Sequence, residues 1–182
     1  MRDKIRDSAF KAVEFLRERE IKTVMITGDN EKTARAIATG IGIDEYFAEL
    51  LPDEKVKIVE RLAESYGTVA MVGDGVNDAP ALAKADVGIA MGAIGSDVSL
   101  ETADIALMQD DLSKISYLVR LSNKTIEIMR ENILTSILIK ATFAILTFPG
   151  LITLWLAVAV GDMSLSLAVI LNAMRLSRIK AE

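Results

Sequence analysis

The sequence predicts a partial, doubly wound α/β domain with a parallel sheet, followed by a two-helix transmembrane hairpin. Three observations support this prediction. Short apolar runs alternate with helical segments in the first part of the chain, polar motifs follow two of these runs, and two long apolar stretches come later. Strands and helices that alternate in this way form parallel sheets, which bind ligands at the carboxyl ends of their strands.

The first 112 residues supply the alternating elements of this domain. Helical segments show apolar side chains at a spacing of three and four residues, and the strands are short β-rich runs such as IKTVMI and TVAMV. One helix opens on Pro52, which suits the first turn of a helix. The expected helices cover residues 5–19, 31–42, 53–65, 78–85 and about 97–103, and the expected strands cover 21–26, 68–72, 87–91 and 105–108.

The remaining 70 residues have a different character, because charged side chains become rare after residue 132. A polar helical stalk is expected over 113–132, transmembrane helices over 133–148 and 151–174, and a tail over 175–182. The second stretch would rise roughly 36 Å as a helix, enough to cross a bilayer. Basic residues flank the pair and the turn between is uncharged, so both ends are predicted to be cytoplasmic in a multi-pass protein of the cell membrane. A buried helical hairpin of a soluble protein is the alternative.

Composition excludes several classes of function. The chain has no cysteine and no histidine, so disulfides, zinc fingers, thiol catalysis and a Ser-His-Asp triad are ruled out within it. The net charge is −5, and the soluble part is acidic, which argues against nucleic acid as a partner. The first residues carry no signal-peptide core and enter a helical pattern at once, which suggests a start inside a larger domain.

Three polar motifs in the α/β part suit phosphate chemistry. The run TGDN (27–30) ends a strand, where the Thr27 hydroxyl and nearby amides can bind a phosphoryl oxygen; a simple helix cap by Asp29 or Asn30 is the alternative. Lys55, in the run PDEK, could neutralise a phosphoryl group or be an ordinary solvated lysine.

The third motif, GDGVNDAP (73–80), is the most specific. It places Asp74 and Asp78 four residues apart in a loop that leaves a buried strand. Mg²⁺ prefers one or two carboxylates and retains several waters, so this loop predicts a magnesium site rather than a plain Gly-Asp turn. The acidic residues argue against a dinucleotide-binding loop, and the chain contains no P-loop motif.

In order, TGDN, PDEK and GDGVNDAP resemble the phosphorylation domain of P-type ATPases, within the haloacid dehalogenase-like superfamily. GIAMG (88–92) and ETAD (101–104) fit the same family. The resemblance implies ATP as substrate and Mg²⁺ as cofactor, with Thr27 and Lys55 at the aspartyl phosphate and Asp74 at Mg²⁺ with Asp78 close behind. The catalytic set it implies is Thr27, Gly28, Asp29, Lys55 and Asn77.

Several parts of such a pump are missing from the sequence. No DKTGT run with the phosphorylated aspartate occurs, and Asp3-Lys4 does not replace it. The nucleotide-binding domain, the actuator domain and the earlier spans are absent too, and they are the expected partners along with membrane lipid. The chain alone is therefore predicted to be inactive. The alternatives are a truncated or split-pump fragment and a soluble phosphatase of the same superfamily.

Two charged residues lie near the middle of the predicted spans. Lys140 and Asp162 would each cost roughly 2.5–3.5 kcal/mol at mid-bilayer, so a role for both is expected. The pair resembles that of the zinc/cadmium/lead exporters, which implies Asp162 as a ligand of a transported divalent heavy-metal ion and Lys140 as its partner. Ser164 stands where that group usually has glycine. A purely stabilising ion pair is the alternative.

Overall fold

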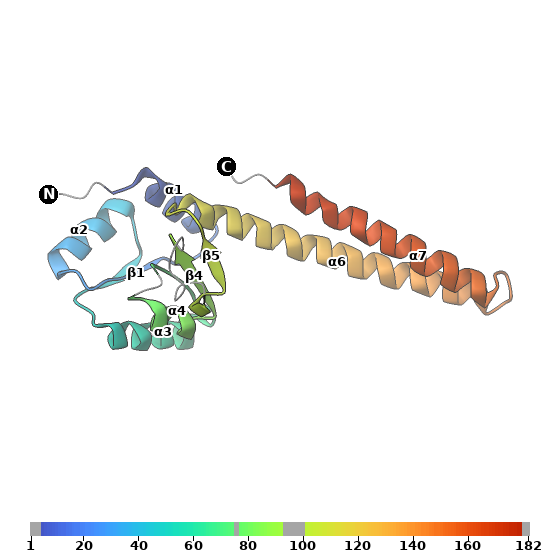
Figure 1. Ribbon diagram of the computed structural model, residues 1–182, viewed down its shortest axis with the longest axis horizontal. Coiled ribbons are helices and arrows are strands. Elements are labelled where there is room, and N and C mark those ends of the chain that lie inside the picture. Colours follow the sequence, from blue (N-terminus) through green and yellow to red (C-terminus); the bar gives the residue numbers. More distant parts are fainter. Residues whose placement is uncertain (1–4, 75–76, 93–100, 180–182) are drawn as a thin grey trace. The chain divides into compact units, whose positions relative to one another are not determined.

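The computed structural model describes residues 5–74, 77–92 and 101–179, apart from the side chains of residues 154 and 156–160. The chain divides into two compact units, Met1–Ser116 and Tyr117–Glu182. The first is an α/β unit and the second is a helical hairpin, and Figure 1 shows the elements of both. The helix expected near 97–103 falls mostly outside the described residues.

The α/β unit contains alternating helices and parallel strands, which confirms the predicted α/β class with parallel strand pairing. Its helices are α1 (Asp7–Arg17), α2 (Glu31–Ile41), α3 (Pro52–Tyr66) and α4 (Ala79–Lys84). Its strands are β1 (Val24–Ile26), β2 (Glu45–Phe47), β3 (Ala70–Gly73), β4 (Val87–Met91) and β5 (Ile105–Leu107). Strand β2 was not predicted, because a three-residue run beginning with glutamate has too short a pattern to stand out.

The strands form two sheets where the sequence predicts one. Among the described residues, β1 pairs only with β2, while β3, β4 and β5 form a separate sheet in that order. All the pairings are parallel, with Val24 opposite Glu45 in the first sheet and Ala70 opposite Val87 in the second. The prediction of a single doubly wound sheet is therefore wrong for this chain, because β1 and β3 do not hydrogen-bond to each other.

Local sequence explains where several elements begin and end. The Asn30 side chain accepts a hydrogen bond from the Thr33 amide and caps α2, which ends at Gly42 with φ of 82°. At the start of α3, the Glu54 carboxylate accepts a hydrogen bond from the Leu51 amide at 2.8 Å, and Pro52 occupies the first turn.

The hydrophobic core lies where α3 and α4 cover the second sheet. Val59 of α3, Leu82 of α4 and Ala90 of β4 are fully buried and pack with Met71 and Ala81. Burying a side chain the size of leucine stabilises a fold by roughly 1.5–3 kcal/mol. The core therefore fixes α3 and α4 against β3 and β4, which bracket the GDGVNDAP loop.

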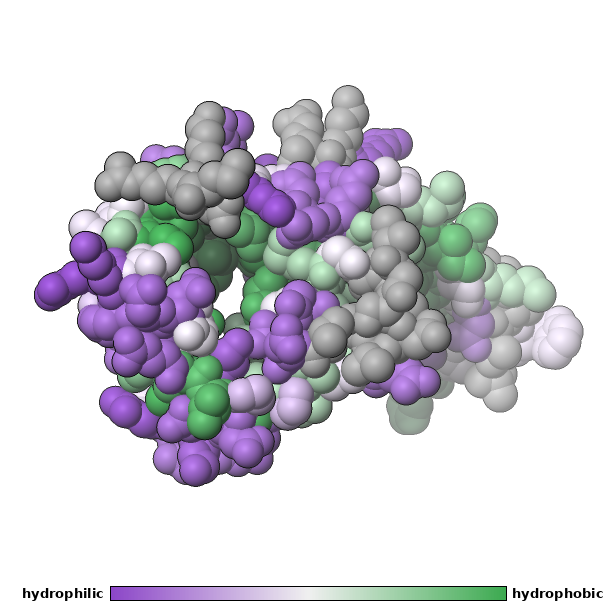
Figure 2. All heavy atoms as spheres, turned by 60° about the vertical axis from the view of Figure 1, so that its left-hand side comes forward, coloured by the Kyte–Doolittle hydropathy of each residue, from purple (hydrophilic) through white to green (hydrophobic). Residues whose placement is uncertain are grey.

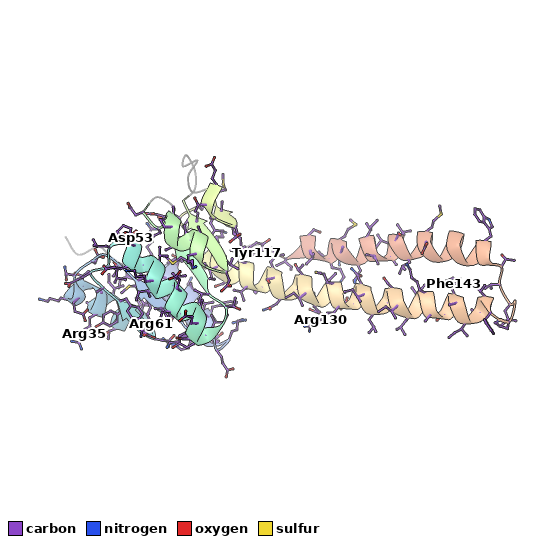
Figure 3. All side chains as sticks on the ribbon, turned by 90° about the horizontal axis from the view of Figure 1, so that it is seen from below. Arg35, Asp53, Arg61, Tyr117, Arg130 and Phe143 are labelled. Carbon is purple, nitrogen blue, oxygen red and sulfur yellow. The ribbon has the colours of Figure 1, made fainter. Side chains whose placement is uncertain are left out.

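The second unit is built from two long antiparallel helices. α6 runs from Ser113 to Thr147, α7 from Leu154 to Ala173, and a short 3-10 turn, η1, covers Met174–Arg178. The helices lie side by side in Figures 1 and 3. They approach closely at Gly161, where an added Cβ would lie 3.3 Å from the Phe143 ring. The turn between the helices contains Gly150 with φ of 77°.

The predicted transmembrane character of this hairpin is not seen. Within the described residues, no helix combines the length and the apolar character that a membrane crossing requires. In α6, the apolar half is interrupted by Thr135, Ser136, Lys140 and Thr142 and follows the charged Arg130 and Glu131, which lowers its average hydropathy. In α7, part of the predicted span 151–174 lies outside the described side chains.

Candidate functional site

The polar motifs lie at the carboxyl ends of two parallel strands. Thr27 directly follows β1, and Asp74 directly follows β3. The carboxyl ends of strands are where open α/β sheets bind ligands. The loop after β3 leads through Asn77 and Asp78 into α4, while Lys55 stands in the first turn of α3. The core thus brings Lys55 of the PDEK run to Asp78 of the loop after β3, whereas Thr27 lies at the end of β1 in the other sheet.

The closest contact at this edge joins two of the predicted site residues. The Lys55 ammonium lies 2.6 Å from Asp78 Oδ1, and the two side chains are only 14% and 16% exposed. Because a partly buried charge is expensive unless paired, this ion pair holds the loop after β3 against α3. Lys55 is therefore not the solvated surface lysine that the sequence left as an alternative.

Gly73 allows the loop to fold back tightly after β3. A Cβ placed there would lie 2.7 Å from both Cβ and Oδ2 of Asp78, closer than real contacts permit. Any other residue at this position would displace the Asp78 carboxylate or the backbone. The first glycine of the GDGVNDAP run is thus required by the approach of Asp78, whatever the ligand.

Asp74 and Asp78 supply the oxygen ligands that suit Mg²⁺. Asp74 is exposed at the strand end, and its Oδ1 accepts a hydrogen bond from the Asn77 amide at 3.2 Å. Oδ1 of Asp78 contacts Lys55, so Oδ2 is the oxygen that could bind a metal ion or a water molecule bound to that ion. Among the described residues, no three acidic side chains converge into a closed metal cage. Two carboxylates with room for water fit a magnesium site of the open kind.

The TGDN motif is organised as a turn into α2. The Thr27 hydroxyl accepts a hydrogen bond from the Asp29 amide at 3.1 Å, and the Thr27 amide donates to the Phe47 carbonyl of the neighbouring strand. Asn30 caps the helix, as the structural alternative proposed. Gly28 lies against the Leu50 carbonyl, 3.3 Å from an added Cβ. Thr27 therefore has a fixed backbone, while Gly28 and Asp29 are exposed at the site's rim.

The structure also brings together the two charged residues of the hairpin. Lys140 of α6 and Asp162 of α7 lie 3.7 Å apart, with side chains 67% and 62% exposed. This is a loose ion pair compared with that of Lys55 and Asp78. The sequence predicted the pairing from matching positions along the two apolar stretches.

A polar cluster in the hairpin was not predicted. Glu131 and Asn132 of α6 meet Asn172 and Arg175 near the end of α7: Arg175 lies 2.7 Å from Glu131, and the Asn172 amide donates to both α6 side chains. Hydrogen bonding by Asn172 and the charge of Arg175 lower the pKa of Glu131. The three-residue spacing of Asn172 and Arg175 on one helix face was the available signal.

Comparisons with known proteins agree with the fold and the motifs of this chain. A family model described as haloacid dehalogenase-like hydrolase matches residues 1–86. The cadmium-transporting ATPase of Staphylococcus aureus is 48% identical over 179 residues, which cover 98% of this chain and 24% of that protein. The zinc-transporting ATPase of Bacillus subtilis is 47% identical over 176 residues, covering 97% of this chain and 27% of the relative.

A solved structure extends the likeness to three dimensions. The crystal structure of a zinc-transporting PIB-type ATPase in its E2.Pi state superimposes with a TM-score of 0.88 at 43% identity, over 97% of this chain and 28% of that one. The fold and the motifs place the chain in the haloacid dehalogenase-like class. Within that class it belongs to the heavy-metal P-type ATPases, and it spans about a quarter of the length of the curated relatives it matches.

Proposed function

We propose that this chain is the part of an ATP-driven heavy-metal transporter that supplies the magnesium-binding half of its phosphorylation site. The observation that carries the proposal is the ion pair of Lys55 and Asp78 beside Asp74. It places a cation and two carboxylates at one strand end, the set of charges that phosphoryl transfer requires. The relatives named as cadmium- and zinc-transporting ATPases support zinc or cadmium as the transported ion.

Each residue of the site has a distinct role in this proposal. Asp74 would hold Mg²⁺, with Asp78 behind it and Asn77 shaping the loop. Mg²⁺, when bound, neutralises charge on the phosphoryl oxygens. Lys55 and the Thr27 hydroxyl would bind further phosphoryl oxygens, and the exposed Gly28 amide region would leave room for the phosphate. The phosphorylated aspartate and the nucleotide-binding domain would come from the rest of the pump.

The hairpin would contribute to the site that binds the transported ion in the same pump. Asp162 offers a carboxylate to the transported cation, and Lys140, 3.7 Å away, can hold that carboxylate's charge after the metal leaves. The loose geometry supports this role, because a tight bidentate pair would compete more strongly with a metal ion. Lys140 is therefore proposed as the partner of the transport ligand rather than as a ligand itself.

A chimera tests the proposal directly. This chain would replace the segment that it matches in the Bacillus subtilis zinc-transporting ATPase, and zinc-stimulated ATP hydrolysis would be measured. We expect activity in the chimera and its loss, by about 10²–10³-fold, with Asp74→Ala. Lys84→Ala, which breaks an exposed ion pair with Glu60, is the matched control. An inactive but correctly folded chimera, or an active Asp74→Ala variant, would contradict the proposal.

Asp162 separates the transport role from the phosphorylation role in the same chimera. Asp162→Ala should abolish zinc stimulation, whereas Asp162→Glu should retain partial activity with altered metal preference, because it keeps a carboxylate. The Lys140→Ala chimera should still bind zinc. Its release of zinc or its dephosphorylation should be slower than in the parent chimera. Full zinc stimulation in Asp162→Ala would leave only a structural ion pair.

A further inference from the structure

Two exposed glutamates have a backbone conformation that residues other than glycine rarely adopt. Glu20 and Glu49 both have φ of 57°, and among the described residues they are the only non-glycine residues with positive φ. This left-handed conformation is unfavourable because it brings Cβ close to a carbonyl oxygen. A side chain is kept in it only where the surrounding contacts require it. The contacts around the two glutamates are different.

Glu20 belongs to the end of a helix. The Glu20 amide donates to the Arg17 carbonyl at 3.0 Å, and the Ile21 amide donates to the Leu16 carbonyl at 3.1 Å. These are the two hydrogen bonds of a Schellman ending, in which a left-handed residue closes a helix. None of these residues belongs to the three polar motifs. The conformation of Glu20 is therefore explained by the local end of α1.

Glu49 instead lies in the loop that connects β2 with α3, residues 48–51. The Glu49 amide donates to the Asp29 carbonyl at 2.8 Å, and the Leu50 amide donates to the Thr27 carbonyl at 3.1 Å. In an extended strand successive amides point to opposite sides. The left-handed turn at Glu49 therefore directs two successive amides of the 48–51 loop toward the backbone of the TGDN turn.

The other end of the 48–51 loop is bonded to the helix that carries Lys55. The Lys55 amide donates to the Leu51 carbonyl at 3.1 Å, and the Leu51 amide donates to the Glu54 carboxylate at 2.8 Å. These bonds attach the first turn of α3 to the last residue of the loop. The loop is thus hydrogen-bonded to the TGDN turn on one side and to the backbone of Lys55 on the other.

Backbone geometry, rather than the carboxylate, distinguishes Glu49. An added Cβ at Gly28 would lie 3.3 Å from the Leu50 carbonyl oxygen, so the loop and the TGDN turn approach closely along their backbones. The Glu49 carboxylate adds only a long contact, 3.4 Å from its Oε1 to the Glu31 amide. Hydrophilic side chains cover much of the face of the α/β unit seen in Figure 2, so an exposed glutamate side chain alone indicates no site.

We propose that Glu49 is a positioning residue for phosphoryl transfer, which sets the place of Thr27 relative to Lys55 through its left-handed backbone. The inference rests on the proposed function, because it concerns the phosphoryl-binding residues named there. Thr27 follows β1, whereas Lys55 stands in α3, which packs on the other sheet. Among the described residues β1 pairs only with β2, so strand pairing does not align the two residues. The 48–51 loop provides a direct hydrogen-bonded connection between them.

A shift of the 48–51 loop would misplace the Thr27 hydroxyl without removing any group that contacts the phosphate. A displacement of about 1 Å can lower a rate by about 10²-fold. Binding of the nucleotide would not change, because the nucleotide-binding domain comes from the rest of the pump. The expected signature is therefore a lower kcat at a constant KM for ATP, with weaker inhibition by orthovanadate, which mimics a transferring phosphoryl group.

The experiment compares the same substitution at two positions with the same φ. Glu49→Val and Glu20→Val each place a β-branched side chain at φ of 57°, in the chimera with the Bacillus subtilis zinc-transporting ATPase. Glu49→Val should lower kcat by about tenfold or more and raise the half-inhibiting concentration of orthovanadate by a similar factor, with KM for ATP unchanged. Glu20→Val should leave all three values unchanged. Glu49→Gly should retain the activity of the parent chimera, because glycine adopts the left-handed conformation readily.

The inference would be overturned by parent values of kcat and inhibition in Glu49→Val, or by equal losses in Glu49→Val and Glu20→Val. Loss of activity in Glu49→Gly would also overturn it, because the carboxylate would then carry the effect. If circular dichroism shows that Glu49→Val does not fold, Glu49→Ala takes its place. It should show a smaller fall in kcat with the same constant KM, and parent values would again overturn the inference.

Amide hydrogen exchange in the full chain separates this inference from the proposed function. Glu49→Val should speed exchange of the Leu50 amide by at least about tenfold, and Glu20→Val should leave it unchanged. This result together with an inactive parent chimera would count against the proposed function and support the role of the loop. An active parent chimera with unchanged Leu50 exchange in Glu49→Val would leave the proposed function intact and overturn the positioning role.

Discussion

The α/β unit and the helical hairpin are stabilised in different ways. All the buried apolar side chains described lie in the α/β unit except Ile128 and Leu165. The hairpin instead exposes many large apolar side chains, among them Ile137, Leu138 and Trp155, and its helices are joined by polar contacts. The comparison shows that the α/β unit has a core of its own, whereas the hairpin combines little apolar burial with hydrogen bonds and ion pairs between its helices.

The largest expected effect contrasts a core leucine with a hairpin leucine. Leu82 is 0% exposed, so Leu82→Ala should lower the free energy of unfolding of the α/β unit by about 2–5 kcal/mol. Leu138 is 59% exposed, so Leu138→Ala should change it by less than about 0.5 kcal/mol. Urea unfolding followed by circular dichroism measures both. Similar losses would show that the hairpin shares the core.

Two glycines test how tightly the α/β unit is packed. An added Cβ at Gly88 would lie 2.8 Å from the Leu82 carbonyl oxygen, which cannot move without shifting α4. Gly88→Ala should therefore destabilise the unit by about 1–3 kcal/mol. At Gly40 the nearest side-chain atom is 3.5 Å away, so Gly40→Ala in α2 should stabilise it by up to about 1 kcal/mol. Thermal unfolding of the two variants gives the signs, and a stable Gly88→Ala protein would contradict the packing.

Two ion pairs between α3 and α4 sharpen the difference between buried and exposed charges. The pair of Lys55 and Asp78 is largely buried, whereas that of Lys84 and Glu60 has side chains 49% and 45% exposed. Lys55→Ala should cost about 1–3 kcal/mol, because it leaves a partly buried carboxylate unpaired. Lys84→Ala should cost less than about 1 kcal/mol. If urea unfolding gave equal losses of free energy for Lys55→Ala and Lys84→Ala, the loop that contains Asp78 would be solvated.

The polar cluster of the hairpin can be broken without altering the α/β unit. Asn172→Ala removes hydrogen bonds to Glu131 and Asn132 and should cost about 1–2 kcal/mol locally. Amide exchange should accelerate in α7 and remain unchanged in α3. Asn123→Ala, at an exposed position of α6, is the control. Unchanged exchange in α7 would show that the helices are held by other contacts.

The smallest expected effect is a pH dependence within the α/β unit. Asp44 Oδ2 accepts hydrogen bonds from the amide and hydroxyl of Thr23, both at 2.8 Å, and these bonds lower the pKa of Asp44. Its contribution is therefore present above the ordinary aspartate pKa and is lost as the pH falls through the lowered value. Unfolding measured from pH 6 downward should show this loss in the parent chain, and Asp44→Asn should reduce the slope. An identical slope would exclude the role.

Sequence patterns determined the described helices, four of the five strand positions and the site motifs. The spacing of apolar residues in α3 and the Pro52 start are local features, so they could be recognised without the fold. The strand end before Asp74 and the pairing of Lys140 with Asp162 followed from position along the chain. Strand β2 and the cluster around Asn172 were missed, because a three-residue strand and a contact between distant residues leave little local pattern.

Only the tertiary structure decided how the strands associate and which site residues touch. Parallel strands are joined through distant parts of the chain, so their neighbours cannot be read from the strands themselves. The fold shows that β1 and β3 do not pair in the described residues, and that Lys55 of α3 approaches Asp78 where Gly73 leaves room for it. The sequence by itself determined which residues could do the chemistry, because their types and spacing are local. The fold decided which of them meet, because that depends on contacts between segments far apart in the chain.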